Sequence, residues 1–246
     1  MSEIKSYAMK THQGPFLNLN EDLVEVDLVN NLFMVIDGFG GSNIGDKAAS
    51  MVRDSLKRSF TKIASDPDST LPFYFSHKYL IEGNALVNAL QVAHQNLSRE
   101  NESKSLDTRG GASVVCGALA ENILTLISTG NCQAYLYRKG HLTIEITADS
   151  LLNVSRDRQA GHFQNAPMSG VGLFEDIHYQ TREIKICSGD LVLLLSDGVF
   201  SRLTEDEIKF LIDNHSGNEM ETINELFKLS NDRGNLDNQT ALLLHF

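Results

Sequence analysis

The chain has 246 residues, of which 41% are hydrophobic and 22% charged, and its formal net charge is −11. A chain of this size and composition can bury a core large enough for a globular domain. The acidic balance argues against a nucleic-acid partner, because proteins bind phosphate backbones through clustered lysines and arginines, and the sequence has no such cluster. Since no stretch resembles a linker, we expect a single domain over residues 1–246.

The N-terminal stretch Met1–Lys10 lacks the apolar core of a signal peptide. The longest wholly aliphatic run, Leu191–Leu195, is far too short to span a bilayer. We therefore expect a cytoplasmic protein with no membrane partner. The three cysteines are an odd number in no metal-ligand spacing, so we expect them to be reduced and mostly buried, which agrees with a reducing compartment.

Hydrophobic periodicity predicts the first elements. Leu23–Val29 and Leu32–Ile36 flank a polar Asn30-Asn31 turn, which indicates a β-hairpin. Apolar residues at three- and four-residue spacing predict a helix over Ile44–Ala64 and a second over about His77–Glu102. Two long helices are thus consecutive.

From Gly110 onward the pattern changes to short runs rich in β-branched and aromatic residues, which indicate an antiparallel meander. Its strands are predicted at 112–120, 123–128, 133–138 and 142–147. The polar segment 149–175 is expected to be an irregular surface flap. The remaining predictions are strands at 177–186, 191–196 and 240–246, and helices near 205–213 and 219–229. Strands grouped with strands and helices paired with helices favour an α+β fold of packed antiparallel sheets covered by helix pairs.

Four short segments place carboxylates where a strand should meet a turn. An apolar strand ends in Asp37-Gly38, where glycine lets backbone and ligand approach closely, and the run ending in Asp197-Gly198 repeats this arrangement. Taken singly, each is also compatible with an ordinary turn, and so are Asp237-Asn238 and the charged pair Glu21-Asp22. Taken together they predict one carboxylate cluster, which a fold can hold only by protonating some members or by binding cations.

A hard divalent cation fits such a cluster best. The glycine loops match neither a nucleotide-binding P-loop nor an EF-hand, and the eight histidines form no zinc pattern. Oxygen ligands favour Mg²⁺ or Mn²⁺.

The ordered set of motifs covers nearly the whole chain. It comprises Asn20-Glu-Asp22, Asp37-Gly-Phe-Gly-Gly41, Gly110-Gly-Ala-Ser113, Gly130-Asn-Cys-Gln133, Ser196-Asp-Gly198 and Asp237-Asn-Gln-Thr240. In this order the motifs resemble the PP2C or PPM family of metal-dependent protein serine/threonine phosphatases, in its compact bacterial form. The resemblance implies a four-layer αββα sandwich with a two-metal centre at one end of the sheets.

By position, the resemblance implies that the catalytic carboxylates are Asp37, which bridges both metals, and Asp197 and Asp237, which hold the second. It further implies that the Gly38 carbonyl binds the first metal and that Glu21 and Asp22 orient metal-bound waters. Two ions would lower the pKa of a bridging water, and the resulting hydroxide would attack the phosphorus of phosphoserine or phosphothreonine in line.

The implied partners are a phosphorylated protein substrate and a cognate serine/threonine kinase or its targets, and we expect a monomer. Leu17 stands where the family commonly places a phosphate-binding arginine, and Phe39 where some relatives have a histidine proposed as general acid. We expect Arg156 or Arg158 to replace the missing anchor, since phosphate recognition favours a bidentate donor. The alternative is two solvated charges on the flap.

Asn131 and Ser201 stand where relatives carry carboxylates for a third, weaker metal. We therefore expect two ions and a lost third site. Two functions remain open: a phosphoprotein phosphatase, attenuated by these departures, or a pseudophosphatase that binds a phosphoprotein or kinase without turnover.

Overall fold

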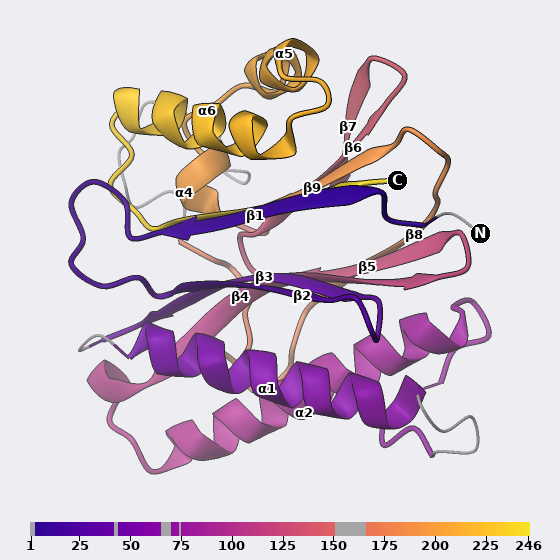
Figure 1. The fold of residues 1–246 in the computed structure, drawn as a ribbon. Coiled ribbons are helices and arrows are strands. Elements are labelled where there is room, and N and C mark those ends of the chain that lie inside the picture. Colours follow the sequence, from indigo (N-terminus) through magenta and orange to yellow (C-terminus); the bar gives the residue numbers. More distant parts are fainter. Residues whose placement is uncertain (1–2, 42–43, 65–69, 74, 151–165) are drawn as a thin grey trace.

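The computed structural model describes residues 3–41, 44–64, 70–73, 75–150 and 166–246. In this part of the chain two five-stranded antiparallel sheets lie face to face, with helices on both outer faces (Figure 1). The αββα sandwich predicted from the sequence is confirmed.

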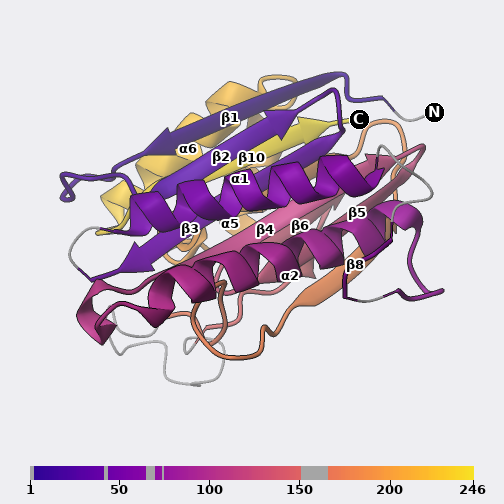
Figure 2. The same cartoon turned by 90° about the horizontal axis from the view of Figure 1, so that it is seen from below.

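The first sheet carries the predicted hairpin and is covered by α1 and α2 (Figure 2). Its strands in spatial order are β2 (Asp22–Asp27), β3 (Leu32–Gly40), β4 (Gly110–Ala120), β5 (Ile123–Thr129) and β8 (Gln180–Lys185). The helices are α1 (Gly45–Ala64) and α2 (Ile81–Glu102), followed by the short 3₁₀ helix η1 (Leu106–Thr108). The second helix therefore begins at Ile81, later than predicted.

The second sheet contains a strand that hydrophobic periodicity did not predict. Its order is β1 (Ser6–His12), β10 (Gln239–His245), β9 (Leu191–Leu195), β6 (Gln133–Arg138) and β7 (His141–Ile146). It is covered by α5 (Glu205–Asn214) and α6 (Glu219–Asp232), and a short helix α4 (Asp197–Phe200) follows β9. Strand β1 is an edge strand in which Ala8 alone is fully buried, so it has too little apolar alternation to be predicted.

The predicted single meander is wrong, because β5 and β6 belong to different sheets. The chain crosses between the sheets at Gly130, whose φ is 87° and whose missing Cβ would lie 2.2 Å from Ser113 Oγ. Only glycine fits this left-handed, crowded position. The crossing places Asn131 at the end of the sandwich.

Strand β3 contributes side chains to two of the three core layers. Its even-numbered Met34 and Ile36 pack toward α1 and α2, whereas Phe33 and Val35 pack between the two sheets. Successive side chains of a strand point to opposite faces, so a continuous apolar run marks a strand buried on both sides. A third layer packs α5 and α6 against the outer face of the second sheet.

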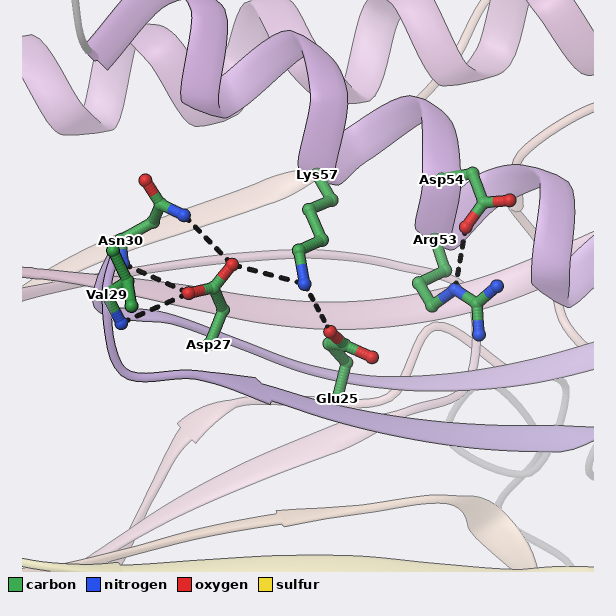
Figure 3. Close-up of polar contacts among 7 residues, drawn as sticks. All are labelled: Glu25, Asp27, Val29, Asn30, Arg53, Asp54 and Lys57. Atoms are coloured by element: carbon green, nitrogen blue, oxygen red, sulfur yellow. Dashed lines mark hydrogen bonds and ion pairs between the residues drawn. The ribbon is translucent and has the colours of Figure 1, made fainter.

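Lys57 joins α1 to the strand beneath it. Its Nζ lies 2.6 Å from Glu25 Oε1 and 3.2 Å from Asp27 Oδ2 (Figure 3). Asp27 also accepts hydrogen bonds from the backbone of Val29 and Asn30 at the hairpin turn. These contacts fix the hairpin under α1, although partly exposed ion pairs contribute only about 1 kcal/mol or less.

Cys116 and Cys132 are buried free thiols, whereas Cys187 is exposed. The prediction of mostly buried, reduced cysteines is thus confirmed for two of them. Among the helices of the described residues, none has the length and apolar character needed to cross a membrane.

Candidate metal centre

The four predicted carboxylate segments meet at one end of the sandwich. Asp22 begins β2 and lies directly opposite Asp37 of β3 in the strand register. Asp197 begins α4 immediately after β9, and Asp237 precedes β10. Because β2 and β3 lie in one sheet and β9 and β10 in the other, the cluster forms where both sheets end.

Asp22 and Asp37 form the centre of the cluster. Ser196 Oγ donates a hydrogen bond to Asp22 Oδ2 over 2.7 Å, which joins the two sheets. Burial raises the pKa of Asp22 to about 7, and the charge of Asp237 adds to this rise despite the hydrogen bond from Ser196. Burial, followed by the charges of Asp22 and Asp197, raises the pKa of Asp37 well above its usual range.

Glu21 shapes the glycine loop that follows Asp37. Its carboxylate Oε1 accepts a hydrogen bond from Gly45 N over 2.8 Å at the start of α1, and its carbonyl accepts from Gly38 N over 3.1 Å. A Cβ on Gly38 would lie 2.1 Å from the Gly45 carbonyl, so glycine is required for this close approach. Burial raises the pKa of Glu21 in spite of the Gly45 hydrogen bond.

Asp197 is 4% exposed, and both its side chain and its backbone carbonyl accept hydrogen bonds. Asn131 Nδ2 donates to Asp197 Oδ2 over 2.9 Å, and Ser201 N donates to the Asp197 carbonyl over 2.9 Å. Burial, and then the charges of Asp237 and Asp22, raise the pKa of Asp197 well above its usual range. The neutral Asn131 amide thus contacts the Asp197 carboxylate, whereas the Ser201 contact is the backbone hydrogen bond that closes α4.

Asn238 is a structural residue of the centre to which the sequence assigned no role. Its Oδ1 accepts from Glu21 N over 2.8 Å, and its Nδ2 donates to the carbonyls of Gln13 and Leu19, each over 2.9 Å. Its own backbone N donates to Asp237 Oδ1 over 2.8 Å. One buried amide thereby fixes the β1–β2 loop and Glu21 beside Asp237. The only sequence signal for this role of Asn238 is the Asp237-Asn238 pair, which by itself is typical of an ordinary turn.

The donors of this cluster suit a hard cation in chemistry and charge. They are carboxylate and backbone carbonyl oxygens, and the mutual repulsion that raises the pKa values is what a divalent ion would relieve. Within the described residues, no group of three or more Asp, Glu, His or Cys side chains is arranged so that it could hold a metal ion. The carboxylates therefore lie near one another but do not surround one point.

The remaining predicted positions lie in different parts of the chain. Arg156 and Arg158 lie outside the described residues. Leu17 lies in the β1–β2 loop and is 39% exposed. The ring of Phe39 lies against Gly111 and Gly170, where a Cβ would approach it to 2.3 Å and 3.0 Å, respectively. Phe39 therefore packs the last part of the predicted flap, at Gly170, against β3 and β4.

Comparison with known proteins places the chain in a family. The family model described as "Stage II sporulation protein E (SpoIIE)" matches residues 74–243, more than half of the chain. A "Putative protein phosphatase 2C-type" of Streptococcus pyogenes serotype M6 is 26% identical over 255 residues, which cover 97% of this chain and 96% of the relative. The chain belongs to the SpoIIE and PP2C-type family, whose relatives include serine/threonine phosphatases.

Solved structures agree with this fold. The structure described as "PppA, a key regulatory component of T6SS in Pseudomonas aeruginosa" is 24% identical, with a TM-score of 0.80 and 98% of each chain covered. The catalytic domain of the serine threonine protein phosphatase PstP, in complex with two manganese ions, is 22% identical, with a TM-score of 0.75. That comparison covers 98% of this chain and 97% of PstP.

Proposed function

We propose that this protein is a Mn²⁺- or Mg²⁺-dependent phosphatase that hydrolyses phosphoserine and phosphothreonine in proteins. The observation that carries the proposal is the carboxylate cluster of Asp22, Asp37, Asp197 and Asp237, assembled from both sheets. Four acidic groups in one partly buried place repel one another, and bound cations would compensate this repulsion. The family and the manganese-bound relative support the same function.

Asp37, the Gly38 carbonyl, Asp197 and Asp237 would hold two ions, with Glu21 and Asp22 orienting water. The ions, when bound, supply acidity to water and charge neutralisation to the phosphate. The protein residues hold the carboxylates in place: Ser196 orients Asp22, Asn131 orients Asp197, and the Asn238 backbone orients Asp237. Since Asn131 and Ser201 bring no charge, we propose that a third ion binds weakly or not at all.

The second candidate is a pseudophosphatase that binds a phosphoprotein, or its kinase, without turnover. The position of Leu17 favours it, because an exposed leucine in the β1–β2 loop cannot donate a hydrogen bond to phosphate. Arg156 or Arg158 is our proposed replacement for that donor. If neither Arg156→Ala nor Arg158→Ala raises KM for a phosphopeptide, this part of the proposal fails.

Hydrolysis of an aryl phosphate separates the two candidates. We expect p-nitrophenyl phosphate to be turned over with Mn²⁺, slowly, and not after chelation with EDTA. Asp197→Asn should abolish turnover, whereas Asp54→Asn, an exposed carboxylate on α1 paired with Arg53, should not. Turnover that EDTA leaves unchanged would refute the metal mechanism, and its absence at every metal concentration would favour the pseudophosphatase.

A further inference from the structure

The loop between β1 and β2 is fixed against the carboxylate cluster. Asn238 Nδ2 donates to the carbonyls of Gln13 and Leu19, so a single buried side chain holds both ends of the loop. In between, Gly14 lies so close to the chain that its missing Cβ would be 2.1 Å from the Asp237 carbonyl. The loop therefore has a defined position beside Asp237.

This fixed loop presents large apolar side chains to solvent. Phe16 is 66% exposed, Leu17 39% and Leu19 37%, and Leu236, the residue before Asp237, is 40% exposed. Single exposed apolar residues are common and need no explanation. These four, which we call the apolar rim, all belong to two loops that touch at Asp237. Clustered exposed apolar residues mark an interaction site more often than scattered ones do.

The charges around the apolar rim limit which ligand it suits. Residues 13–21 and 235–238 contain no lysine or arginine, and they contribute Glu21 and Asp237. Asp22 and Asp37 lie next to them. Because these segments have no lysine or arginine, they offer an acidic flanking residue no ion pair, whereas an apolar peptide can bury its side chains against Phe16 and its neighbours.

We infer that the apolar rim selects phosphoprotein substrates in which apolar residues flank the phosphorylated serine or threonine. This inference rests on the proposed function, because it requires the phosphate to enter the carboxylate cluster. A serine side chain is short, and an extended peptide advances about 3.3 Å per residue. When the phosphate lies beside Asp237, the flanking residues therefore come within reach of the loops that carry Phe16 and Leu236.

The test uses peptides that bind without being hydrolysed. Fluorescein-labelled peptides carry a difluoromethylene phosphonate analogue of phosphoserine, flanked on both sides by leucine, serine, aspartate or lysine. Affinities are measured by fluorescence anisotropy with Mn²⁺ at low and high salt. We expect the leucine-flanked peptide to bind about five- to tenfold more tightly than the serine-flanked one, as burial of part of a leucine side chain predicts. This ratio should not fall at high salt.

Variants then assign the preference to the rim. Phe16→Ser, and separately Leu236→Ser, should reduce the leucine-to-serine ratio to less than about twofold, because the apolar contact is removed. The matched control is Phe75→Ser, which alters an apolar side chain of similar exposure, 54%, before α2 and should keep the ratio. A circular dichroism melt checks that each variant folds.

Several results would overturn the inference: a wild-type ratio within twofold, tightest binding of the lysine-flanked peptide, no binding of any peptide, or a ratio that both rim variants retain. Turnover of p-nitrophenyl phosphate is measured in parallel. If turnover is absent and the ratio is as expected, the proposed phosphatase activity fails while the apolar selection stands. If turnover is present and the ratio is flat, only the apolar selection fails.

Discussion

Replacing Asp197 by asparagine should have opposite effects on the metal-free and the metal-bound protein. The substitution keeps the size of a side chain that is 4% exposed, and the new amide oxygen can still accept the hydrogen bond from Asn131 Nδ2. It removes one charge from a group of neighbouring carboxylates whose repulsion raises their pKa values. At pH 7.5 with EDTA, we therefore expect Asp197→Asn to melt at a higher temperature than the wild type.

With Mn²⁺ the order should reverse. An ion present at a hundred times its Kd stabilises the fold by about 2.7 kcal/mol per site. In a chain of 246 residues this corresponds to a rise in Tm of about 5–11 °C, since 1 kcal/mol shifts Tm by about 2–4 °C at this size. Asp197→Asn should lose most of this rise because it removes an anionic ligand.

Differential scanning fluorimetry over a Mn²⁺ titration measures both effects. Asp54→Asn serves as the control, since its carboxylate lies on the exposed side of α1, paired with Arg53 at 2.8 Å, and should leave both values unchanged (Figure 3). A wild-type Tm that millimolar Mn²⁺ does not move, or an equal rise in Asp197→Asn, would refute the assignment. A variant that was merely destabilised would melt lower with EDTA as well.

Three further predictions concern other parts of the molecule. Asn131→Asp combined with Ser201→Asp should create measurable binding of a third ion by calorimetry and raise turnover, because the substitutions would add one carboxylate at Asn131, whose amide contacts Asp197, and one at the C-cap of α4, one turn after Asp197; turnover no faster than wild type would make the third site irrelevant. Asn238→Asp keeps the acceptor for Glu21 N but loses both donors to the β1–β2 loop, so it should lower the free energy of unfolding by about 2–4 kcal/mol and weaken Mn²⁺ binding; unchanged Mn²⁺ affinity would show that the loop does not position the ligands. Asp190 is only 1% exposed, and burial alone would raise its pKa. Hydrogen bonds from Arg138 and from Cys187 N outweigh burial and hold the pKa of Asp190 below the usual 3.8. The ionised Asp190 stabilises the fold above its unfolded-state pKa, and this stabilisation is lost as the pH falls through its folded-state pKa. Asp190→Asn should therefore lower the free energy of unfolding, measured in urea, by about 1.5–3 kcal/mol at pH 7 and by less near pH 3. A loss that does not depend on pH would contradict this.

Long periodic elements could be predicted from the sequence because their pattern is local. The apolar stripe of α1 and the two-sided apolar run of β3 each record, in consecutive residues, which faces are buried. Edge strand β1 could not be predicted in this way, since its stability comes from backbone pairing with β10, far away in the chain. The helix α4 is a single turn that begins at Asp197, too short to show a period.

The grouping of strands with strands and of helices with helices in the sequence was sufficient to predict an α+β fold, and the family resemblance implied the four-layer sandwich. The acidic strand ends predicted one carboxylate cluster that includes Asp37, Asp197 and Asp237. Only the tertiary structure determined that Glu21 binds the start of α1, that Asn131 donates to Asp197, and that Asn238 fixes the β1–β2 loop. The physical reason is that hydrophobic periodicity is set by neighbours in the chain. A hydrogen bond such as Asn238 to Gln13 joins residues 225 positions apart and exists only after both sheets have packed.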